Sequence, residues 1–390
     1  MNKVPGFGLV ERAQALLPLI AREADEIERT RRLTEPVVSA LIENGLYRSL
    51  LPLSVGGAEA PPEIFMQMLE EIAKADASTA WCLGQCSVCA MTAAYLDLDA
   101  SHEIFGAPNS ILAWGAIANE VQVVPGGYRI TARWDFASGS RQANWLGAHV
   151  RVVEPDGTKR LKPNGAPEIR TIVFPAADAT MHDVWDVIGL SGTGTDSYSV
   201  ENLFIPDKFA ALRDDPAGLR EKGPLYGFTT YTMFGLGFAA ISVGVARATL
   251  DATIELARGK ASVGLKAMRE NNAVQGAIGR IEGNLRAARA YIYATAAEAW
   301  RDATQTGKVS EEHRTALRLA STWTIHQAAS VVDTAYHMAG ATAVFSANKF
   351  ERRFRDMHAI AQQIQARDTH YEDAGKVILS ARLNTPPTTR

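Results

Sequence analysis

Residues 126–145 read GGYRITARWDFASGSRQANW, and this stretch decides the middle of the fold. Gly126-Gly127 is a turn signal, and residues 128–136 are a run of β-branched and aromatic residues that predicts a strand leaving that turn. A second stretch, DVIGLSGTGTDSYSVENLFIP at 186–206, contains a similar run at 197–204. Both stretches therefore indicate β structure.

Short runs of the same kind surround these two stretches, at 111–114, 121–124, 145–153 and 170–174. Pro155-Asp156-Gly157 and Pro163-Asn164-Gly165 separate several of them as turns. We therefore expect residues 109–215 to form an antiparallel β-barrel domain.

The pattern becomes helical on both sides of this region. Residues 10–96 carry apolar side chains near a 3.6-residue period, and 228–258, 272–304, 311–339 and 349–380 are four long periodic segments. Four long helices favour a bundle. The prediction is an α+β chain with a helical domain at 1–108, the β domain at 109–215 and a four-helix bundle at 216–390.

Composition and charge argue against several classes of function. The chain has 390 residues, 47% of them hydrophobic, with 40 Lys+Arg against 43 Asp+Glu. A net charge of −3 without a basic stripe argues against a nucleic-acid partner. Residues 1–11 lack the pattern of a signal peptide, so we expect a cytoplasmic protein. Residues 223–246 carry no charge, but the helical pattern continues past Arg247, which favours a buried central helix over a membrane span.

Cys82, Cys86 and Cys89 lie at i, i+4 and i+7, which places three thiols on one helical face. A metal or redox site is one interpretation, but no obvious fourth ligand lies nearby in sequence. We favour core packing and expect no metal. No G-x-G-x-x-G or P-loop motif occurs, so a Rossmann or P-loop nucleotide site is unsupported.

The order of helical domain, β domain and four-helix bundle resembles the acyl-CoA dehydrogenase superfamily over essentially the whole chain. Five local segments carry this resemblance, in the order of that family: LPLSVGGAE at 51–59, DASTAW at 76–81, the two β stretches quoted above, and ERRFRDMHA at 351–359.

Two chemistries occur on this fold. Acyl-CoA dehydrogenases use a glutamate to remove a substrate proton, and the resemblance places Ile364 at its usual position. Residues 223–246, where some relatives place it, contain no carboxylate, which leaves only Glu372. The wording WxFASG, here Trp134 to Gly139, is more typical of two-component flavin-dependent monooxygenases.

The resemblance to these monooxygenases implies residues for the reaction. Ser138 is the candidate donor beside the flavin, although a turn hydroxyl is the alternative. Several hydroxylases have a histidine where this chain has Gln363, which cannot titrate near neutral pH. His358 and His370 flank that position, as catalysts or as structural hydrogen-bonding residues.

The resemblance also implies binding residues. Phe136, Ala137 and Ser138 match the strand that faces the flavin ring, and Gly192 and Thr193 belong to a tight loop beside it, with an ordinary turn as the alternative. Arg269 and Gln275 resemble the residues that neighbouring subunits use for the pyrophosphate and adenosine part of a flavin. Trp81, Gln85 and Trp114 are candidates for substrate, with core filling as the alternative.

We therefore expect the oxygenase component of a two-component flavin-dependent monooxygenase. It would hydroxylate a small aromatic substrate, indolic or phenolic, with O₂ and reduced FAD or FMN supplied by a flavin reductase. The mostly apolar segment at 228–246 needs cover on nearly all sides, which predicts a homotetramer. The alternatives are an acyl-CoA dehydrogenase and a non-catalytic, flavin-free binding protein.

Overall fold

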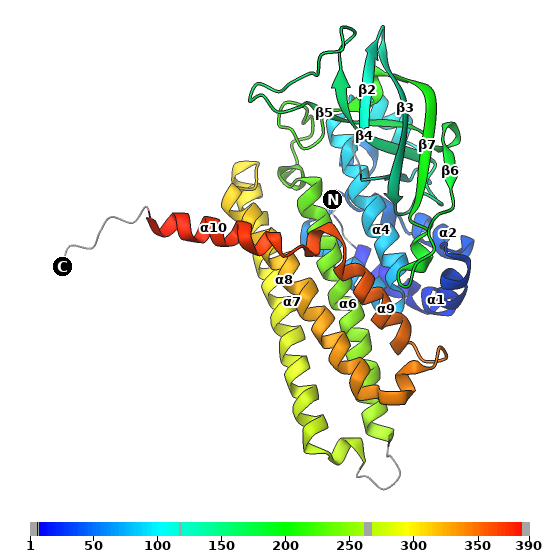
Figure 1. The fold of residues 1–390 in the computed structure, drawn as a ribbon, viewed down its shortest axis with the longest axis vertical. Helices are drawn as coiled ribbons and strands as arrows, with labels where there is room; N and C mark the ends of the chain where they lie inside the picture. The colour runs from blue at the N-terminus through cyan, green and yellow to red at the C-terminus, as the bar shows by residue number, and fades with distance from the viewer. Residues whose placement is uncertain (1–5, 7, 117–118, 261–266, 384–390) are drawn as a thin grey trace, which may run out of the picture. The chain divides into compact units, whose positions relative to one another are not determined.

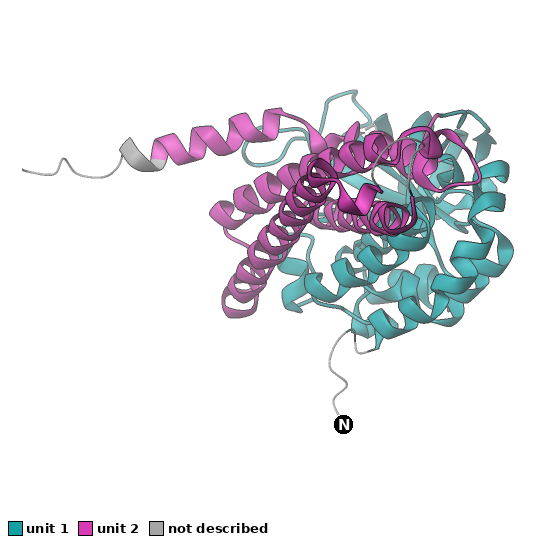
Figure 2. Ribbon diagram, turned by 90° about the horizontal axis from the view of Figure 1, so that it is seen from below, with its two compact units in different colours: residues 1–187, 191–230 teal, residues 188–190, 231–390 magenta. Residues whose placement is uncertain are grey.

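The computed structural model describes residues 6, 8–116, 119–260 and 267–383 (Figure 1). They fall into two compact units, one made of residues 1–187 and 191–230 and the other of 188–190 and 231–390 (Figure 2). The N-terminal helices and the strands share the first unit, and the C-terminal helices form the second. A division into three domains at 108 and 215 stays a prediction.

Helices make up the first unit as far as residue 105. They are α1 (Leu9–Thr30), α2 (Glu35–Glu43), α3 (Pro62–Ala75), α4 (Ala77–Ala90) and α5 (Leu98–Phe105). Helix α4 begins at Asp76, whose carboxylate accepts a hydrogen bond from the Thr79 backbone N–H at 2.6 Å. Every side chain of α4 except that of Gln85 is buried, so this helix runs through the interior of the chain.

The strands form one sheet in the order β6-β7-β3-β2-β4-β5-β8, with β1 paired to β4. Their bounds are β1 Leu112–Trp114, β2 Asn119–Val124, β3 Gly127–Ala137, β4 Trp145–Val153, β5 Ile169–Pro175, β6 Thr180–His182, β7 Asp196–Pro206 and β8 Ala210–Ala211. The two quoted stretches thus become neighbours, because β3 and β7 pair antiparallel. This pairing positions the candidate site.

Two features of the sheet differ from an antiparallel barrel. Strand β4 runs parallel to β1 and to β2. Strand β2 lies between β3 and β4, and it pairs antiparallel with β3 across the turn at Gly126. The described strands also leave the sheet open, since its ends are β6 with three residues and β8 with two, and these do not pair with each other. The helical, sheet and helical order of the predicted fold class is confirmed.

The second unit contains α6 (Thr230–Gly259, from Tyr231), α7 (Asn272–Thr306), α8 (Glu311–Ala339), α9 (Phe350–Ala361) and α10 (Thr369–Leu383). The predicted single helix over 349–380 is wrong, because the chain breaks between α9 and α10. At the break, Gln363 has an extended backbone and its side-chain oxygen accepts a hydrogen bond from the Gln365 N–H at 2.7 Å. This local bond competes with continuation of the helix.

Polar contacts join the long helices of the second unit. Arg247 of α6 pairs with Glu282 of α7 at 2.6 Å, and the Thr324 hydroxyl of α8 donates to the Ala288 carbonyl of α7 at 3.3 Å. Helix α6 is long and apolar enough to span a membrane, yet 89% of its most apolar window is buried inside the protein. It therefore matches the predicted central helix.

Candidate functional site

Ser138 follows directly after β3 and is held from two sides. The Trp81 indole N–H, from α4, donates to Ser138 Oγ at 3.0 Å, and Thr195 Oγ1 lies 2.7 Å from the same oxygen. Thr195 Oγ1 is in turn 2.7 Å from Thr193 Oγ1. The structure therefore brings together three predicted residues, Trp81, Ser138 and Thr193, through Thr195, which the sequence did not single out.

The register of β3 and β7 causes this convergence. Ala137 pairs with Asp196, so the residues just beyond this pair, Ser138 and Thr195, emerge side by side. Ala137 itself is fully buried, and Ser138 is only 5% exposed. The register shifts between the pairs formed by Trp134 and by Ala137, which marks a bulge of the kind that redirects side chains at functional sites.

Phe136 occupies that bulge with an unusual backbone. Its φ angle is +60°, a left-handed value that is rare for a bulky residue, and its side chain is 62% exposed. The Trp185 ring meets it edge-on, with 6.5 Å between ring centroids. A strained aromatic residue beside a buried hydroxyl is the kind of outlier that points to a binding site for a flat ligand.

The loop at 191–194 packs so closely that it requires glycine. A Cβ atom on Gly192 would lie 2.3 Å from Cγ2 of Ile27, and Gly194 has a φ of +50°. The Thr193 carbonyl accepts a weak hydrogen bond from the Cys82 thiol at 3.5 Å. Gly192 and Thr193 therefore lie at the predicted loop, and close packing accounts for the glycine at 192.

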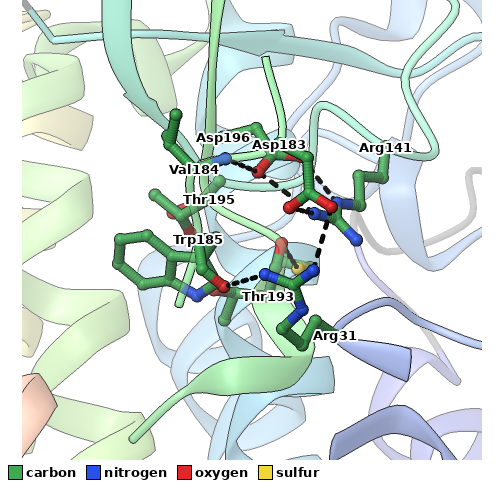
Figure 3. A network of polar contacts seen from close by, with 10 residues as sticks. Arg31, Arg141, Asp183, Val184, Trp185, Thr193, Thr195 and Asp196 are labelled. Atoms are coloured by element: carbon green, nitrogen blue, oxygen red, sulfur yellow. Dashed lines mark hydrogen bonds and ion pairs between the residues drawn. The ribbon is translucent and has the colours of Figure 1, made fainter. Parts of the chain in front are cut away.

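A charged network braces the loop (Figure 3). Arg141 binds both carboxylate oxygens of Asp196, at 2.6 and 3.1 Å, and its Nη2 also lies 2.9 Å from Asp183. Arg31 completes the network by pairing with Asp183 at 2.9 Å and donating to the Trp185 carbonyl at 2.8 Å. The hydrogen bond with Asp196 raises the pKa of Arg141, so the guanidinium stays charged.

Sequence reasoning missed these four charged residues. Arg141 and Asp196 stand in the two stretches that mark the β region, each just beyond or at the end of a predicted strand. Opposite charges at the ends of two paired strands were the available signal. Asp183 and Arg31 gave no such signal, because only the tertiary fold places them together.

Gln85 and Trp114 belong to a different cluster of the first unit. The Gln85 amide donates to Cys89 Sγ at 3.7 Å, and the Trp114 ring lies 5.0 Å from the His149 ring and 5.1 Å from the Arg213 guanidinium. Burial lowers the pKa of His149 well below its usual range. No described contact joins this cluster to Ser138.

The three cysteines are buried in α4. Burial raises the pKa of the Cys82 thiol to about 12 and raises those of Cys86 and Cys89 as well. These thiols are therefore protonated near neutral pH and poor nucleophiles. Within the described ranges, no group of three or more His, Cys, Asp or Glu side chains is placed to hold a metal ion.

His370 is a buried, neutral histidine of the second unit. The Thr322 hydroxyl donates to the Gln365 carbonyl at 2.7 Å, so it accepts from His370 Nδ1 at 2.8 Å. His370 Nε2 is then the acceptor for the Tyr231 hydroxyl at 3.0 Å. Burial, followed by the charge of Arg318, lowers the pKa of His370.

The neighbouring candidates have different surroundings. His358 Nε2 lies 2.9 Å from Asp333, and its ring packs on Phe354 at 4.3 Å. The Gln363 amide nitrogen is buried, and the described residues offer it no hydrogen-bond partner. Gln363 therefore caps the turn with its oxygen and keeps an unused donor.

The arginine and aspartate of the RFRD sequence in α9 hold residues 188–190. The Leu190 N–H donates to Asp356 at 2.6 Å, and Arg355 donates to the Ile188 carbonyl at 2.6 Å. A Cβ atom on Gly189 would lie 2.2 Å from the Arg355 carbonyl oxygen. This motif therefore anchors the segment that directly precedes the loop at 191–194 in the chain.

Arg269 lies in the short turn before α7, and Gln275 lies in the first turn of that helix. Gln275 donates to the Arg269 carbonyl at 2.7 Å, while the Arg269 guanidinium is exposed and lies 3.6 Å from Glu270. The structure brings this predicted pair into contact and leaves the guanidinium at the surface.

The first-unit residues fit a flavin. Phe136 offers an exposed apolar ring, and Ser138 offers a hydroxyl whose position is set by Trp81 and Thr195. Reduced flavin needs such a preorganised donor in a site that excludes water.

Comparison with known proteins identifies the family. Family models for the acyl-CoA dehydrogenase N-terminal and C-terminal domains match residues 15–103 and 236–367. The chain is 30% identical over 353 residues to an indole-3-acetate monooxygenase of Pseudomonas putida, covering 90% of this chain and 88% of that protein. The chain belongs to the acyl-CoA dehydrogenase superfamily.

Relatives within the superfamily are flavin-dependent monooxygenases. The oxygenase subunit HsaA of Rhodococcus jostii, named a flavin-dependent monooxygenase, is 28% identical over 362 residues, covering 90% of this chain and 92% of that protein. The crystal structure of the 3-HSA hydroxylase from Rhodococcus sp. RHA1 aligns with a TM-score of 0.86 and 26% identity, covering 98% of both chains.

This superfamily member is therefore an oxidoreductase, a flavin-dependent monooxygenase that uses reduced flavin. The acyl-CoA dehydrogenase alternative lacks a base, because Ile364 stands at the usual position and Glu372 is exposed on α10. The flavin-free binding protein is likewise not supported.

Proposed function

We propose that the chain is the oxygenase component of a two-component system that hydroxylates a small aromatic substrate, indolic or phenolic. A separate flavin reductase supplies the reduced flavin. When bound, that flavin supplies two electrons to O₂, so that one oxygen atom enters the substrate as a hydroxyl group and the other leaves as water. The similarity to a protein named for indole-3-acetate supports an aromatic substrate.

The buried hydroxyl of Ser138 beside the exposed ring of Phe136 is the observation that carries this proposal. Ser138 would donate a hydrogen bond to the flavin, with its oxygen positioned by Trp81. Phe136, Ala137 and the loop with Gly192 and Thr193 would help to hold the flavin.

Other residues receive proposed roles from the contacts that surround them. The unused donor of Gln363 and the Tyr231-linked His370 are the candidates for proton handling or substrate orientation in the second unit. His358 is a third candidate, although its pairing with Asp333 satisfies Nε2. Arg269 and Gln275 are proposed to bind the distal part of a flavin held by a neighbouring subunit, and Gln85 and Trp114 to bind substrate.

The proposed assembly is a homotetramer in the cytoplasm. Helix α10 projects beyond the other helices of the second unit in both views (Figures 1 and 2), and Val377, Ile378 and Leu379 on it are exposed apolar residues. Exposed apolar side chains on a projecting helix favour a protein contact. Light scattering at micromolar concentration should show an oligomer, and a monodisperse monomer contradicts the assembly.

Titration with reduced FAD and reduced FMN without oxygen tests the cofactor. We expect saturable binding of at least one of them, and absence of both overturns the function. Admitting air in the presence of indole-3-acetate or 4-hydroxyphenylacetate as probes should then give a product heavier by one oxygen atom, detected by mass spectrometry with ¹⁸O₂. Reduction of an electron acceptor by an acyl-CoA contradicts the proposal.

A further inference from the structure

We propose that Thr195, backed by Thr193, is a positioning residue that keeps the Ser138 hydroxyl in the donor role toward the flavin. This inference rests on the proposed function, in which Ser138 meets the flavin. Neither threonine needs to touch the flavin for the effect, because both act through Ser138.

Three buried hydroxyl groups form a continuous chain. Ser138 Oγ and Thr195 Oγ1 are 2.7 Å apart, and Thr195 Oγ1 and Thr193 Oγ1 are also 2.7 Å apart. The exposed fractions of these residues are 5%, 5% and 1% for Ser138, Thr195 and Thr193. Each hydroxyl carries one proton and two lone pairs, so the direction of each hydrogen bond decides what the next group can do.

Trp81 sets the direction of one bond. An indole N–H can only donate, so Ser138 Oγ accepts from Trp81 and has one lone pair and one proton left. If Ser138 donated to Thr195, no proton would remain for the flavin. If Thr195 donates instead, both Ser138 lone pairs are occupied and its proton points to the ligand. An acceptor on the flavin therefore selects the order Thr193 to Thr195 to Ser138.

Neighbouring contacts restrain the positions of the three hydroxyl oxygens. Asp196, directly after Thr195, is clamped by Arg141 through two hydrogen bonds, and the Thr193 carbonyl accepts from the Cys82 thiol. Hydrogen bonds in such a chain polarise one another, so a proton donated by Thr195 strengthens Ser138 as a donor. Thr195 also restricts the rotamer of Ser138, because loss of its bond frees the serine to turn.

The experiment compares Thr195→Val, Thr195→Ser and a control, Thr92→Val. Valine matches threonine in shape but lacks the hydroxyl. Thr92 is also fully buried, and the described residues offer its hydroxyl no partner. Each protein, loaded with reduced FAD or FMN, is mixed with air, and hydrogen peroxide release is followed in the absence of an aromatic substrate.

We expect Thr195→Val to release peroxide about threefold to tenfold faster than the natural chain, which is the value of one hydrogen bond. Thr195→Ser should restore the natural rate to within about twofold, since it keeps the hydroxyl. Thr193→Val should have a smaller effect, because it acts one bond further away. A natural rate in Thr195→Val overturns the inference.

A double variant tests whether Thr195 acts through Ser138. In a Ser138→Ala background, Thr195→Val should add nothing, because neighbours in one network are not additive. An equal effect in both backgrounds overturns the proposal. If the natural chain binds neither reduced flavin, the proposed function fails as well. Binding with a silent Thr195→Val removes only the role of Thr195.

A spectroscopic readout needs no flavin. The indole N–H of Trp81 reports its acceptor, so its ¹H–¹⁵N signal, assigned among seven tryptophans with Trp81→Phe, should move in Thr195→Val. The Thr92→Val spectrum should match the natural one at that signal. An unmoved Trp81 signal in Thr195→Val contradicts the hydroxyl chain itself.

Discussion

Ser138 in the first unit and His370 in the second are both buried polar side chains with two hydrogen-bond partners, yet the partners leave them in different states. Trp81 and Thr195 can fill both lone pairs of Ser138 and leave its proton free. Tyr231 and Thr322 use the proton and the lone pair of neutral His370. The Ser138 hydroxyl can therefore donate directly to a ligand, whereas His370 can exchange a proton only through Tyr231 or Thr322.

The origin of the two sites differs as well. Strand pairing between β3 and β7 sets the first, so a repeating ladder of hydrogen bonds fixes the position of Ser138. A break between two helices sets the second, where Gln363 and Gln365 hold a single turn. The ladder follows from alternating residues in the sequence, whereas the break depends on one side-chain bond.

The largest effect on peroxide release is expected from removal of the Ser138 hydroxyl, whose proton is free to meet the flavin. Ser138→Ala should accelerate peroxide release from reduced flavin and O₂ about a hundredfold, because one preorganised donor contributes roughly 2–4 kcal/mol at comparable oxyanion sites. Stopped-flow mixing with air measures this rate. Ser140→Ala is the control, since Ser140 is equally buried and its hydroxyl has no partner among the described residues. Equal rates in both variants would remove Ser138 from the site.

The next effect concerns the brace beside Ser138. Asp196→Asn leaves Arg141 short of a partner and should cost about 2 kcal/mol of unfolding free energy, less than the roughly 3–5 kcal/mol of a fully buried pair, because Arg141 keeps Asp183. Urea unfolding measures it. Glu255→Gln, in an exposed pair with Arg258, should change stability by less than about 0.5 kcal/mol. A similar loss in both variants contradicts the brace.

Acid should lower the stability of the fold through His370, both of whose ring nitrogens have hydrogen-bond partners. Because the pKa of His370 is lowered in the folded chain, the unfolded chain binds more protons below its ordinary pKa of about 6.5. Stability is therefore full above that pH and falls as the pH drops toward the folded pKa. His370→Gln should flatten part of this fall in urea midpoints measured between pH 7 and 5.

His149 offers a comparison in the first unit, because burial lowers its pKa as well. The lowered pKa of His149 has the same effect on stability, so His149→Gln should also reduce the loss of stability as the pH drops. An unchanged slope in His370→Gln would show that His370 is not buried and neutral as described. Such a result would leave the first-unit site unaffected.

The smallest effect is expected at Glu372. Its side chain is exposed on α10, so Glu372→Gln should change neither peroxide release nor product yield by more than about twofold, since exposed substitutions are usually near neutral. Product analysis with the aromatic probes measures it. Loss of activity in this variant would restore a carboxylate base to the mechanism.

The sequence was sufficient for the class of fold, and it named Trp81, Ser138 and Thr193 of the β3–β7 cluster but not Thr195. Periodic apolar residues predicted α6, α7 and α8, and β-branched runs predicted β1 to β5 and β7. The short strands β6 and β8 were missed, because Thr180–His182 and Ala210–Ala211 contain no run of β-branched and aromatic residues. The break at 362–368 was also missed, because no glycine or proline marks it in the sequence QQIQARD.

The tertiary structure decided how the candidate residues are grouped. The local sequence pattern indicated Trp81, Ser138 and Thr193. Only the register of β3 with β7 and the burial of α4 connect these residues through Thr195, by hydrogen bonds of 3.0 Å or less. The same holds for Arg31 and Asp183, which lie 152 positions apart. Periodicity records which face of an element is buried, whereas the partner across that face depends on packing between segments that the sequence keeps apart.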